Sequence, residues 1–197
     1  MAARNLVLVG FMGSGKTAVG RRVAALLGLA FVDLDDDIVA RTGKSIVAIF
    51  REGGEPEFRR LEVEAVKRAV RGRGQVIAPG GGAVMNDESW RRMADGNLVV
   101  FLDASSRALL RRIRGREEVR TGAGRRPPNI RPLADVPADA PRWPARARAR
   151  VLALLRERLP RYREAHVTVP TTGRTPEEVA AEVARLAREA GLGAAAR

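Results

Sequence analysis

The chain has 197 residues, of which 45% are hydrophobic and 30% charged, the composition of a soluble globular protein with a core of ordinary size. It contains no cysteine, which excludes disulfides and thiolate metal sites, and no apolar run approaches the length of a membrane span. The net charge of +13 reflects a bias toward arginine, and with 4% aromatic residues and no known nucleic-acid-binding motif we expect no nucleic-acid partner.

The first element, residues 6–9, is a run of apolar residues typical of a short buried strand. It leads into Gly10–Thr17, which matches G-x-x-x-x-G-K-[ST], and a helical pattern follows and ends at Gly28. This is the context of a phosphate-binding loop, in which glycines let backbone N–H groups point at phosphate oxygens. Lys16 would reach the β- and γ-phosphates, and the Thr17 hydroxyl would hold Mg²⁺. The residues predicted to bind ATP here are Gly13, Ser14, Gly15, Lys16, Thr17 and Ala18.

A second strand is predicted at residues 30–32, with Asp33 and Asp35 at its carboxyl end. Ligands gather beyond the carboxyl ends of parallel strands, and alternation along a strand places residues two apart on one side. The two carboxylates could therefore serve Mg²⁺ and a substrate hydroxyl. Capping of the next helix explains the same acidic run equally well.

Helical segments are predicted at residues 36–42, 45–51 and 56–70. Arg59 stands in the last of these, with Glu62 three positions further on. The two could form a surface ion pair of little energetic weight. Alternatively, Glu62 could hold Arg59 ready to bind a substrate carboxylate.

A third strand at 75–78 ends at Pro79 and the glycines Gly80, Gly81 and Gly82, which form either a plain turn or a loop that approaches a ligand closely. A helix near 87–93 and a strand at 98–102 follow, and Ser105 can cap the next helix. Residues 115–140 lose periodicity and are too long for an ordinary connection, which indicates a lid or a disordered insert.

The pattern then resumes with a helix around 145–159 and a strand at 166–169. Thr175, Pro176 and Glu178 give the last helix a capping box with proline at its first position. Strands therefore alternate with helices along the whole chain, which predicts a parallel α/β sheet.

Together these motifs resemble those of shikimate kinase, in order and over nearly the whole chain. The segments that carry the resemblance are Val9–Thr17, Phe31–Asp35, Thr42–Ile46, Ile49–Phe50, Gly54–Glu62, Gly80–Val84, Ile130–Leu133 and Arg158–Tyr162. The resemblance implies a three-layer P-loop kinase fold with a five-stranded parallel sheet of order 2-3-1-4-5, flanked by helices, plus a lid. It also implies transfer of the ATP γ-phosphate to the 3-hydroxyl of shikimate, with Mg²⁺, in aromatic amino-acid biosynthesis.

The resemblance further predicts one kinase domain over residues 1–190, with a substrate-binding region at about 33–62, a lid at about 115–135 and a frayed tail at 191–197. Because members of the family are commonly monomeric, the resemblance also implies a monomer. The amino terminus lacks the pattern of a signal peptide, so we expect a cytoplasmic protein without a membrane partner.

Carried over to this sequence, the resemblance gives each site residue a role. Asp35 would bind the shikimate hydroxyls and accept the proton of the reacting one, while Asp33 would support Mg²⁺ beside Thr17. Arg59 and Arg158 would bind the shikimate carboxylate. The pocket would be lined by Gly80, Gly81 and Gly82.

Three further arginines complete the implied site. Arg131 would swing in from the lid toward the phosphates, Arg120 would act in the same way, and Arg174 would lie near the adenine. The chain departs from the family pattern at Pro79, where a small hydroxyl residue is usual, and in a lid that is longer by a few residues.

Two other functions remain open from the sequence. One is a kinase of the same fold that acts on another polyhydroxylated acid or cyclitol. The other is a non-catalytic P-loop protein that binds partners such as nucleic acid, which strong salt dependence of binding without turnover would indicate.

Overall fold

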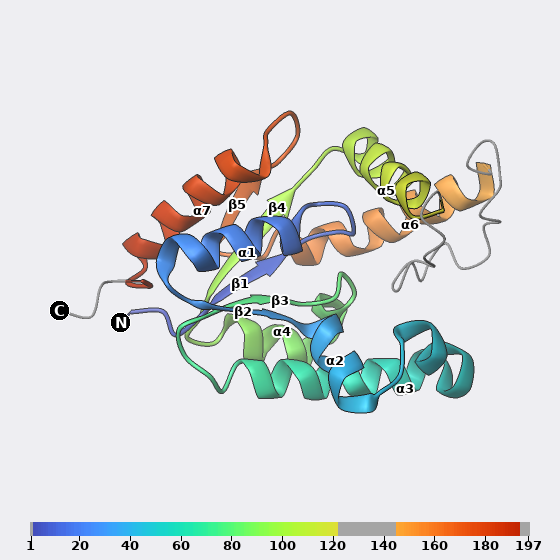
Figure 1. Ribbon diagram of the computed structural model, residues 1–197, viewed down its shortest axis with the longest axis horizontal. Helices are drawn as coiled ribbons and strands as arrows, with labels where there is room; N and C mark the ends of the chain where they lie inside the picture. The colour runs from blue at the N-terminus through green and yellow to red at the C-terminus, as the bar shows by residue number, and fades with distance from the viewer. Residues whose placement is uncertain (1, 122–144, 194–197) are drawn as a thin grey trace.

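The computed structural model describes residues 2–121 and 145–193, and in this part a five-stranded parallel sheet forms the centre of the molecule (Figure 1). The strand order is β2-β3-β1-β4-β5 and every neighbouring pair is parallel, which confirms the order that the resemblance implies. The strands are β1 (Leu6–Val9), β2 (Ala30–Asp33), β3 (Gln75–Ala78), β4 (Leu98–Asp103) and β5 (Val167–Pro170).

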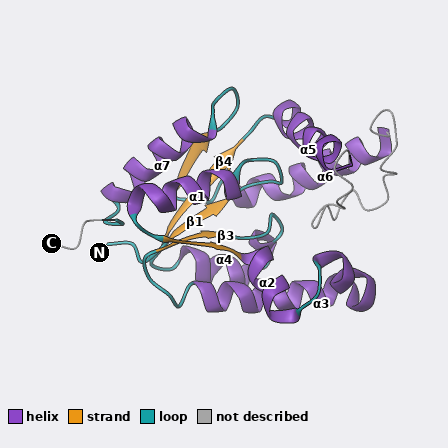
Figure 2. Ribbon diagram, in the orientation of Figure 1, coloured by secondary structure: helices purple, strands orange, loops and turns teal. Residues whose placement is uncertain are grey.

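Helices cover both faces of this sheet and give the predicted three layers (Figure 2). Side chains alternate along β1, so that Leu6 and Leu8 face one core, shared with α1 and α7, while Val7 and Val9 face the other, shared with α3 to α6. The helices are α1 (Lys16–Leu27), α2 (Leu34–Thr42), α3 (Ile46–Ala69), α4 (Asp87–Ala94), α5 (Ser106–Thr121), α6 (Ala145–Tyr162) and α7 (Pro176–Glu189), with a short 3₁₀ helix, η1 (Ala83–Met85).

Most element ends fall where local chemistry predicts them. Ser45 caps α3, and the Thr175 hydroxyl accepts a hydrogen bond from the Glu178 N–H (3.2 Å) in a complete capping box at α7. The two helices predicted at 45–51 and 56–70 form one element, α3, that breaks at Gly54 (φ 69°, ψ −171°), just before Pro56.

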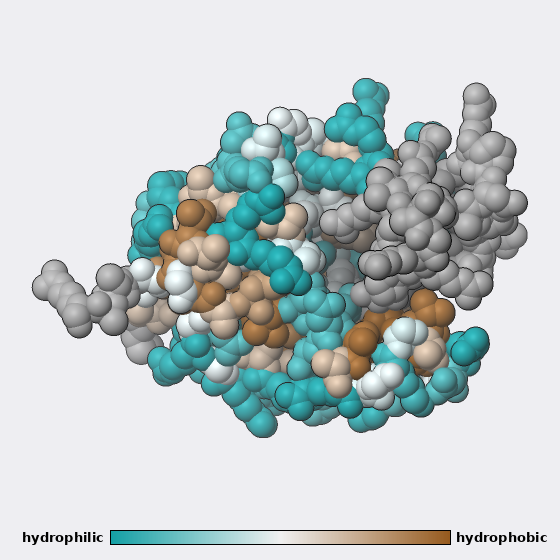
Figure 3. Space-filling view, in the orientation of Figure 1, coloured by the Kyte–Doolittle hydropathy of each residue, from teal (hydrophilic) through white to brown (hydrophobic). Residues whose placement is uncertain are grey.

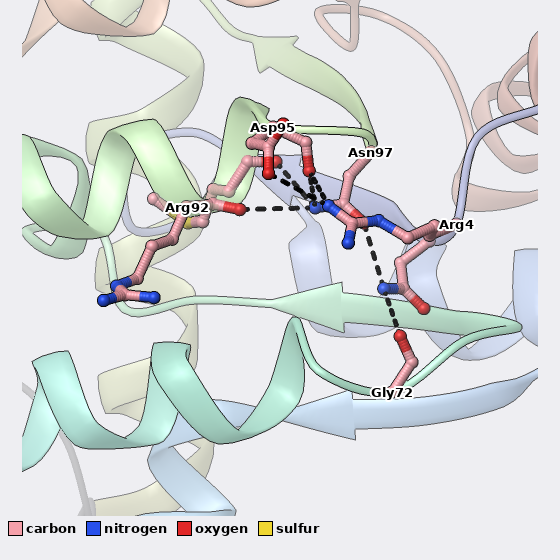
Figure 4. Close-up of polar contacts among 7 residues, drawn as sticks. Arg4, Gly72, Arg92, Asp95 and Asn97 are labelled. Atoms are coloured by element: carbon pink, nitrogen blue, oxygen red, sulfur yellow. Dashed lines mark hydrogen bonds and ion pairs between the residues drawn. The ribbon is translucent and has the colours of Figure 1, made fainter. Parts of the chain in front are cut away.

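A network of polar contacts ties the strands together at their amino ends, opposite to the edge at which ligands gather (Figure 4). The side-chain amide of Asn5, fully buried, donates to the Gly72 carbonyl (2.8 Å) and to Asn97 Oδ1 (3.0 Å). The Asn97 amide donates in turn to the carbonyls of Met93 and Asp95 (3.2 and 3.1 Å). These bonds fix the turns before β3 and β4.

Among the coloured residues of Figure 3, hydrophilic ones lie mostly along the edges, and hydrophobic ones gather between them. Leu26, Val47 and Met85 are the large hydrophobic residues that stay exposed in the described part of the chain. Within 2–121 and 145–193, no helix combines the length and the apolar character needed to cross a membrane.

Candidate active site

The loop between β1 and α1 has the backbone geometry of a phosphate-binding loop. Gly10, Gly13 and Gly15 have φ values of 149°, 80° and 106°, which side chains disfavour. The Ser14 N–H donates to the Phe11 carbonyl (3.1 Å) and closes the turn. The loop runs directly into the first turn of α1, where a helix has N–H groups without intrahelical partners and the positive end of its dipole.

Lys16 is the first residue of α1, and its side chain folds back over this loop. Its Nζ donates to the carbonyls of Gly10 (2.8 Å) and Phe11 (3.3 Å). The ammonium group therefore lies beside the loop in which a nucleotide phosphate would bind.

Asp33 connects the loop to the second strand through both of its carboxylate oxygens. Oδ2 accepts a hydrogen bond from the Thr17 hydroxyl (3.0 Å), and Oδ1 accepts one from the Asp35 N–H (3.1 Å). Asp33 is the last residue of β2 and the N-cap of α2. The capping and ligand-site interpretations of this residue thus describe the same carboxylate.

The prediction that Asp35 lies at the end of a strand is wrong. Residues from Leu34 onward are helical, because Leu34 and Ile38, one turn apart and each 1% exposed, bury one face of α2. Asp35 therefore stands in the first turn of α2, so strand alternation does not set its direction.

Carboxylates concentrate at this helix start. Burial raises the pKa of Asp36, the carboxylates of Asp33 and Asp35 raise it further, and Arg21 opposes them. The side chains at the start of α2 thus repel one another, and a nearby cation would relieve that repulsion.

The three glycines after β3 lie against the side chains of several elements. A Cβ atom added to Gly80 would come within 2.5 Å of Glu62 Oε1 and 3.3 Å of Asp35 Oδ1. One added to Gly82 would lie 2.4 Å from Arg59 Nη1, and one added to Gly81 would lie 3.7 Å from Arg158 Nη1. This segment, Gly80–Gly82, is called the triple-glycine loop below. Its close contacts bring together four ionic side chains that three different helices carry.

Arg59 is held by two acidic residues of α3. Its Nη1 donates to Glu62 Oε2 (2.7 Å), and its Nη2 donates to Glu55 Oε1 (2.8 Å). Burial lowers the pKa of Arg59, but the two carboxylates outweigh burial and raise it. Because the Glu62 side chain is only 3% exposed, this is not the surface pair that spacing alone allows.

Arg158 comes from α6, far along the chain, yet it lies at the same place. Its Cζ atom is 5.8 Å from the centre of the Phe11 ring, so the guanidinium is stacked near the phosphate-binding loop. Arg59 thus lies next to Gly82 and Arg158 next to Gly81, and the binding of one carboxylate by both arginines stays a prediction.

Sequence reasoning missed Arg112 and Phe11. Arg112 on α5 donates to the Gly13 carbonyl (3.3 Å) and to the Thr171 carbonyl (2.6 Å), so it links the phosphate-binding loop to the end of β5. No motif marks Arg112, because its partners lie 99 and 59 positions away. Phe11 lies within the phosphate-binding motif, and this position is the sequence signal that could have identified it.

Arg174 lies after β5 and forms an ion pair with Glu182 (2.6 Å), while its backbone N–H donates to the Thr171 carbonyl (3.4 Å). Arg131, predicted to act from the lid, lies outside the described residues, as does the side chain of Arg120 in the last turn of α5.

In the ranges 2–121 and 145–193, no cluster of three or more Asp, Glu, His or Cys side chains could hold a metal ion by itself.

Comparisons with known proteins identify relatives of this chain. The family model described as "Shikimate kinase" matches residues 12–188. A shikimate kinase of Symbiobacterium thermophilum is 41% identical over 188 residues, which cover 95% of this chain and 98% of the relative. One of Thermodesulfovibrio yellowstonii is 37% identical over 180 residues, 91% of this chain and 92% of that one. The solved structure of "Shikimate kinase from Acinetobacter baumannii in complex with shikimate" superimposes with a TM-score of 0.77 at 29% identity, covering 95% of this chain and 94% of that chain.

Proposed function

This chain belongs to the shikimate kinase family, and we propose that it transfers the γ-phosphate of ATP to the 3-hydroxyl of shikimate. One observation carries the proposal for the acceptor. The triple-glycine loop lies in contact with Asp35, Arg59 and Arg158, next to a phosphate-binding loop. Two cations suit a carboxylate, and the carboxylate of Asp35 suits hydroxyl groups, so the set fits a hydroxylated acid.

The chemistry that these residues would perform is phosphoryl transfer by positioning and charge neutralisation. The carboxylate of Asp35 takes the proton of the 3-hydroxyl while the oxygen of that hydroxyl forms a bond to the γ-phosphorus. The bond from that phosphorus to the β,γ-bridging oxygen breaks, and ADP leaves. Lys16 and Arg131 stabilise the negative charge on the transferred group.

Arg59 and Arg158 hold the carboxylate at the other end of shikimate, while Gly80, Gly81 and Gly82 let the ring approach the backbone. On the nucleotide side, Gly13, Ser14, Gly15, Lys16, Thr17 and Ala18 bind the phosphates. Arg120 and Arg174 complete the ATP site in this proposal.

We also propose that Thr17 and Asp33 hold Mg²⁺. Their side-chain oxygens lie 3.0 Å apart at the loop, and Mg²⁺ prefers oxygen ligands and is commonly bound by one or two protein groups together with substrate phosphates. The ion would supply charge neutralisation at the β- and γ-phosphates.

We further propose that residues 1–190 work as one cytoplasmic, monomeric kinase domain, with substrate binding at about 33–62, a lid at about 115–135 and a tail at 191–197. The absence of cysteine supports the location, because cytoplasmic proteins do not depend on disulfides. The lid falls largely outside the described residues.

The proposal is tested by ADP release with ATP, Mg²⁺ and one acceptor at a time: shikimate, quinate, gluconate or none. We expect turnover with shikimate alone. Turnover with another acceptor alone would refute the substrate assignment, and binding of nucleic acid without turnover of any acceptor would refute a kinase.

Arg59 and its neighbour Arg60 provide a matched test of the carboxylate site. Both lie on α3 and both form ion pairs, but Arg60 pairs with Glu57 away from the triple-glycine loop. We expect Arg59→Ala to raise KM for shikimate about 30-fold or more, since a charged hydrogen bond contributes about 2–3 kcal/mol, and to leave KM for ATP unchanged. Arg60→Ala should change neither KM.

A further inference from the structure

Tyr162, the single tyrosine of the chain, is completely buried in the last turn of α6. Its ring stacks on Phe101 of β4, with ring centres 5.2 Å apart and planes 17° apart. A buried phenol needs a hydrogen-bond partner. The Tyr162 hydroxyl has one in the Gly81 carbonyl, to which it donates at 2.5 Å across 81 positions of sequence.

The same hydroxyl lies next to Arg158. The two residues are four apart on α6 and thus share one face of the helix. A Cβ atom on Gly81 would be 3.5 Å from the Tyr162 hydroxyl and 3.7 Å from Arg158 Nη1, so all three groups meet at one point. The centre of the Phe11 ring lies 5.8 Å from the Cζ atom of the same guanidinium.

The phenol is a donor under all working conditions. Burial raises the pKa of Tyr162 well above its ordinary value, although the positive charge of Arg158 lowers it in part. The bond to the Gly81 carbonyl therefore persists across the pH range in which a kinase is assayed.

The position of Arg158 depends on this packing. Its Nε is buried and makes no hydrogen bond within 2–121 and 145–193, so that atom does not fix the side chain. A second contact of α6, the ion pair of Arg161 with Asp87, anchors the helix to α4 on another side. Tyr162 joins α6 directly to the backbone of the triple-glycine loop.

We propose that Tyr162 is a positioning residue for shikimate, because its bond to Gly81 sets the spacing between the triple-glycine loop and Arg158. This inference rests on the proposed function, in which both groups bind the acceptor. Tyr162 does not touch the reacting atoms. Its effect reaches the substrate through the position of Arg158.

The test is Tyr162→Phe, which removes one oxygen and keeps the ring on Phe101. We expect KM for shikimate, and its Kd by calorimetry, to rise about tenfold, because one of the two cations is misplaced. KM for ATP and kcat should stay within about twofold, since the phosphate-binding loop is unchanged. The control is Asp87→Asn, which removes the ion pair between α6 and α4 and should leave KM for shikimate as in the wild type.

An unchanged KM for shikimate in Tyr162→Phe would overturn the inference. Equal rises in KM for shikimate and ATP, or an equal rise in Asp87→Asn, would also overturn it, because general loosening of α6 would then explain the effect. These failures differ from failure of the proposed function, in which the wild-type protein itself does not turn over shikimate.

Discussion

Replacing Gly82 by alanine should displace Arg59 without straining the backbone. Gly82 has φ −100° and ψ −12°, values that alanine adopts freely. The new methyl group would nevertheless lie 2.4 Å from Arg59 Nη1 and 3.0 Å from its Cζ and Nη2. The end of an arginine is normally free to move aside, but here Glu62 and Glu55 hold it.

The size of the effect follows from these distances. Ordinary contact with a methyl group begins near 3.4 Å, so Nη1 has to move by about 1 Å, which breaks or lengthens its 2.7 Å bond to Glu62. A hydrogen bond between charged groups contributes about 1.5–3 kcal/mol, and relaxation of the exposed part of Arg59 recovers some of that. We expect Gly82→Ala to lower the free energy of unfolding by about 1–2 kcal/mol and to raise KM for shikimate about tenfold.

The neighbouring glycine supplies the control. A Cβ atom on Gly81 would have its nearest neighbours at 3.5 Å, an ordinary contact, and neither glycine has a left-handed φ. Gly81→Ala should therefore change the free energy of unfolding by less than about 0.5 kcal/mol. Urea denaturation of both variants and steady-state kinetics of Gly82→Ala test the reasoning. Equal losses of stability in the two variants, or an unchanged KM for shikimate in Gly82→Ala, would refute it.

The remaining predictions concern the acidic residues around α2. Asp35→Asn should reduce kcat about 100-fold or more while calorimetric ATP binding is retained, and wild-type turnover would show that Asp35 is not the proton acceptor. Burial raises the pKa of Asp37, but hydrogen bonds from Arg68 and Arg41 outweigh it and lower the pKa below 3.8. The ionised Asp37 carboxylate thus stabilises the protein above pH 3.8, and this stabilisation is lost as the pH falls through the lowered pKa. Asp37→Asn should therefore be less stable than the wild type at pH 7 and equally stable near pH 2. A stability gap independent of pH would contradict this cause. Asp33→Ala should lower the free energy of unfolding by about 1 kcal/mol, because the cap of α2 is lost. Asp33→Asn should keep the cap but lose Mg²⁺-dependent turnover. Equal stability of the two variants would argue against the cap.

Most of the fold could be predicted because its elements carry local signals. The strand at residues 6–9 is a continuous apolar run, and the helix after Thr175 has a complete capping box, so both were placed correctly. The strand order came from the family resemblance instead. Five short apolar runs specify a parallel sheet but do not specify which strand lies beside which.

One error lies where polar residues hide the periodicity. The sequence predicts irregular structure at residues 115–121, but α5 continues to Thr121, since arginine and glutamate favour helix without marking a buried face. The last strand begins at Val167, one residue later than predicted. The terminal residue of an element is the part that sequence patterns define least.

The assembly of the site could be predicted only in part. The phosphate-binding loop is contiguous, so its motif was enough to locate it. The contacts of Tyr162 with Gly81 and of Arg112 with Gly13 join residues 81 and 99 positions apart. They depend on how α5 and α6 pack against the sheet, which no local pattern encodes.

Asp33 shows why a structural interpretation does not weaken a functional one. From spacing alone, capping of α2 and support of Mg²⁺ were competing explanations of one carboxylate, but each oxygen of Asp33 serves a different partner. The oxygen that caps α2 fixes where the helix begins, and so fixes Asp35 two residues later. The other oxygen holds the Thr17 hydroxyl at the phosphate-binding loop. A change at Asp33 therefore moves the proposed proton acceptor and the proposed metal ligand together, which couples the acceptor side of the site to its nucleotide side.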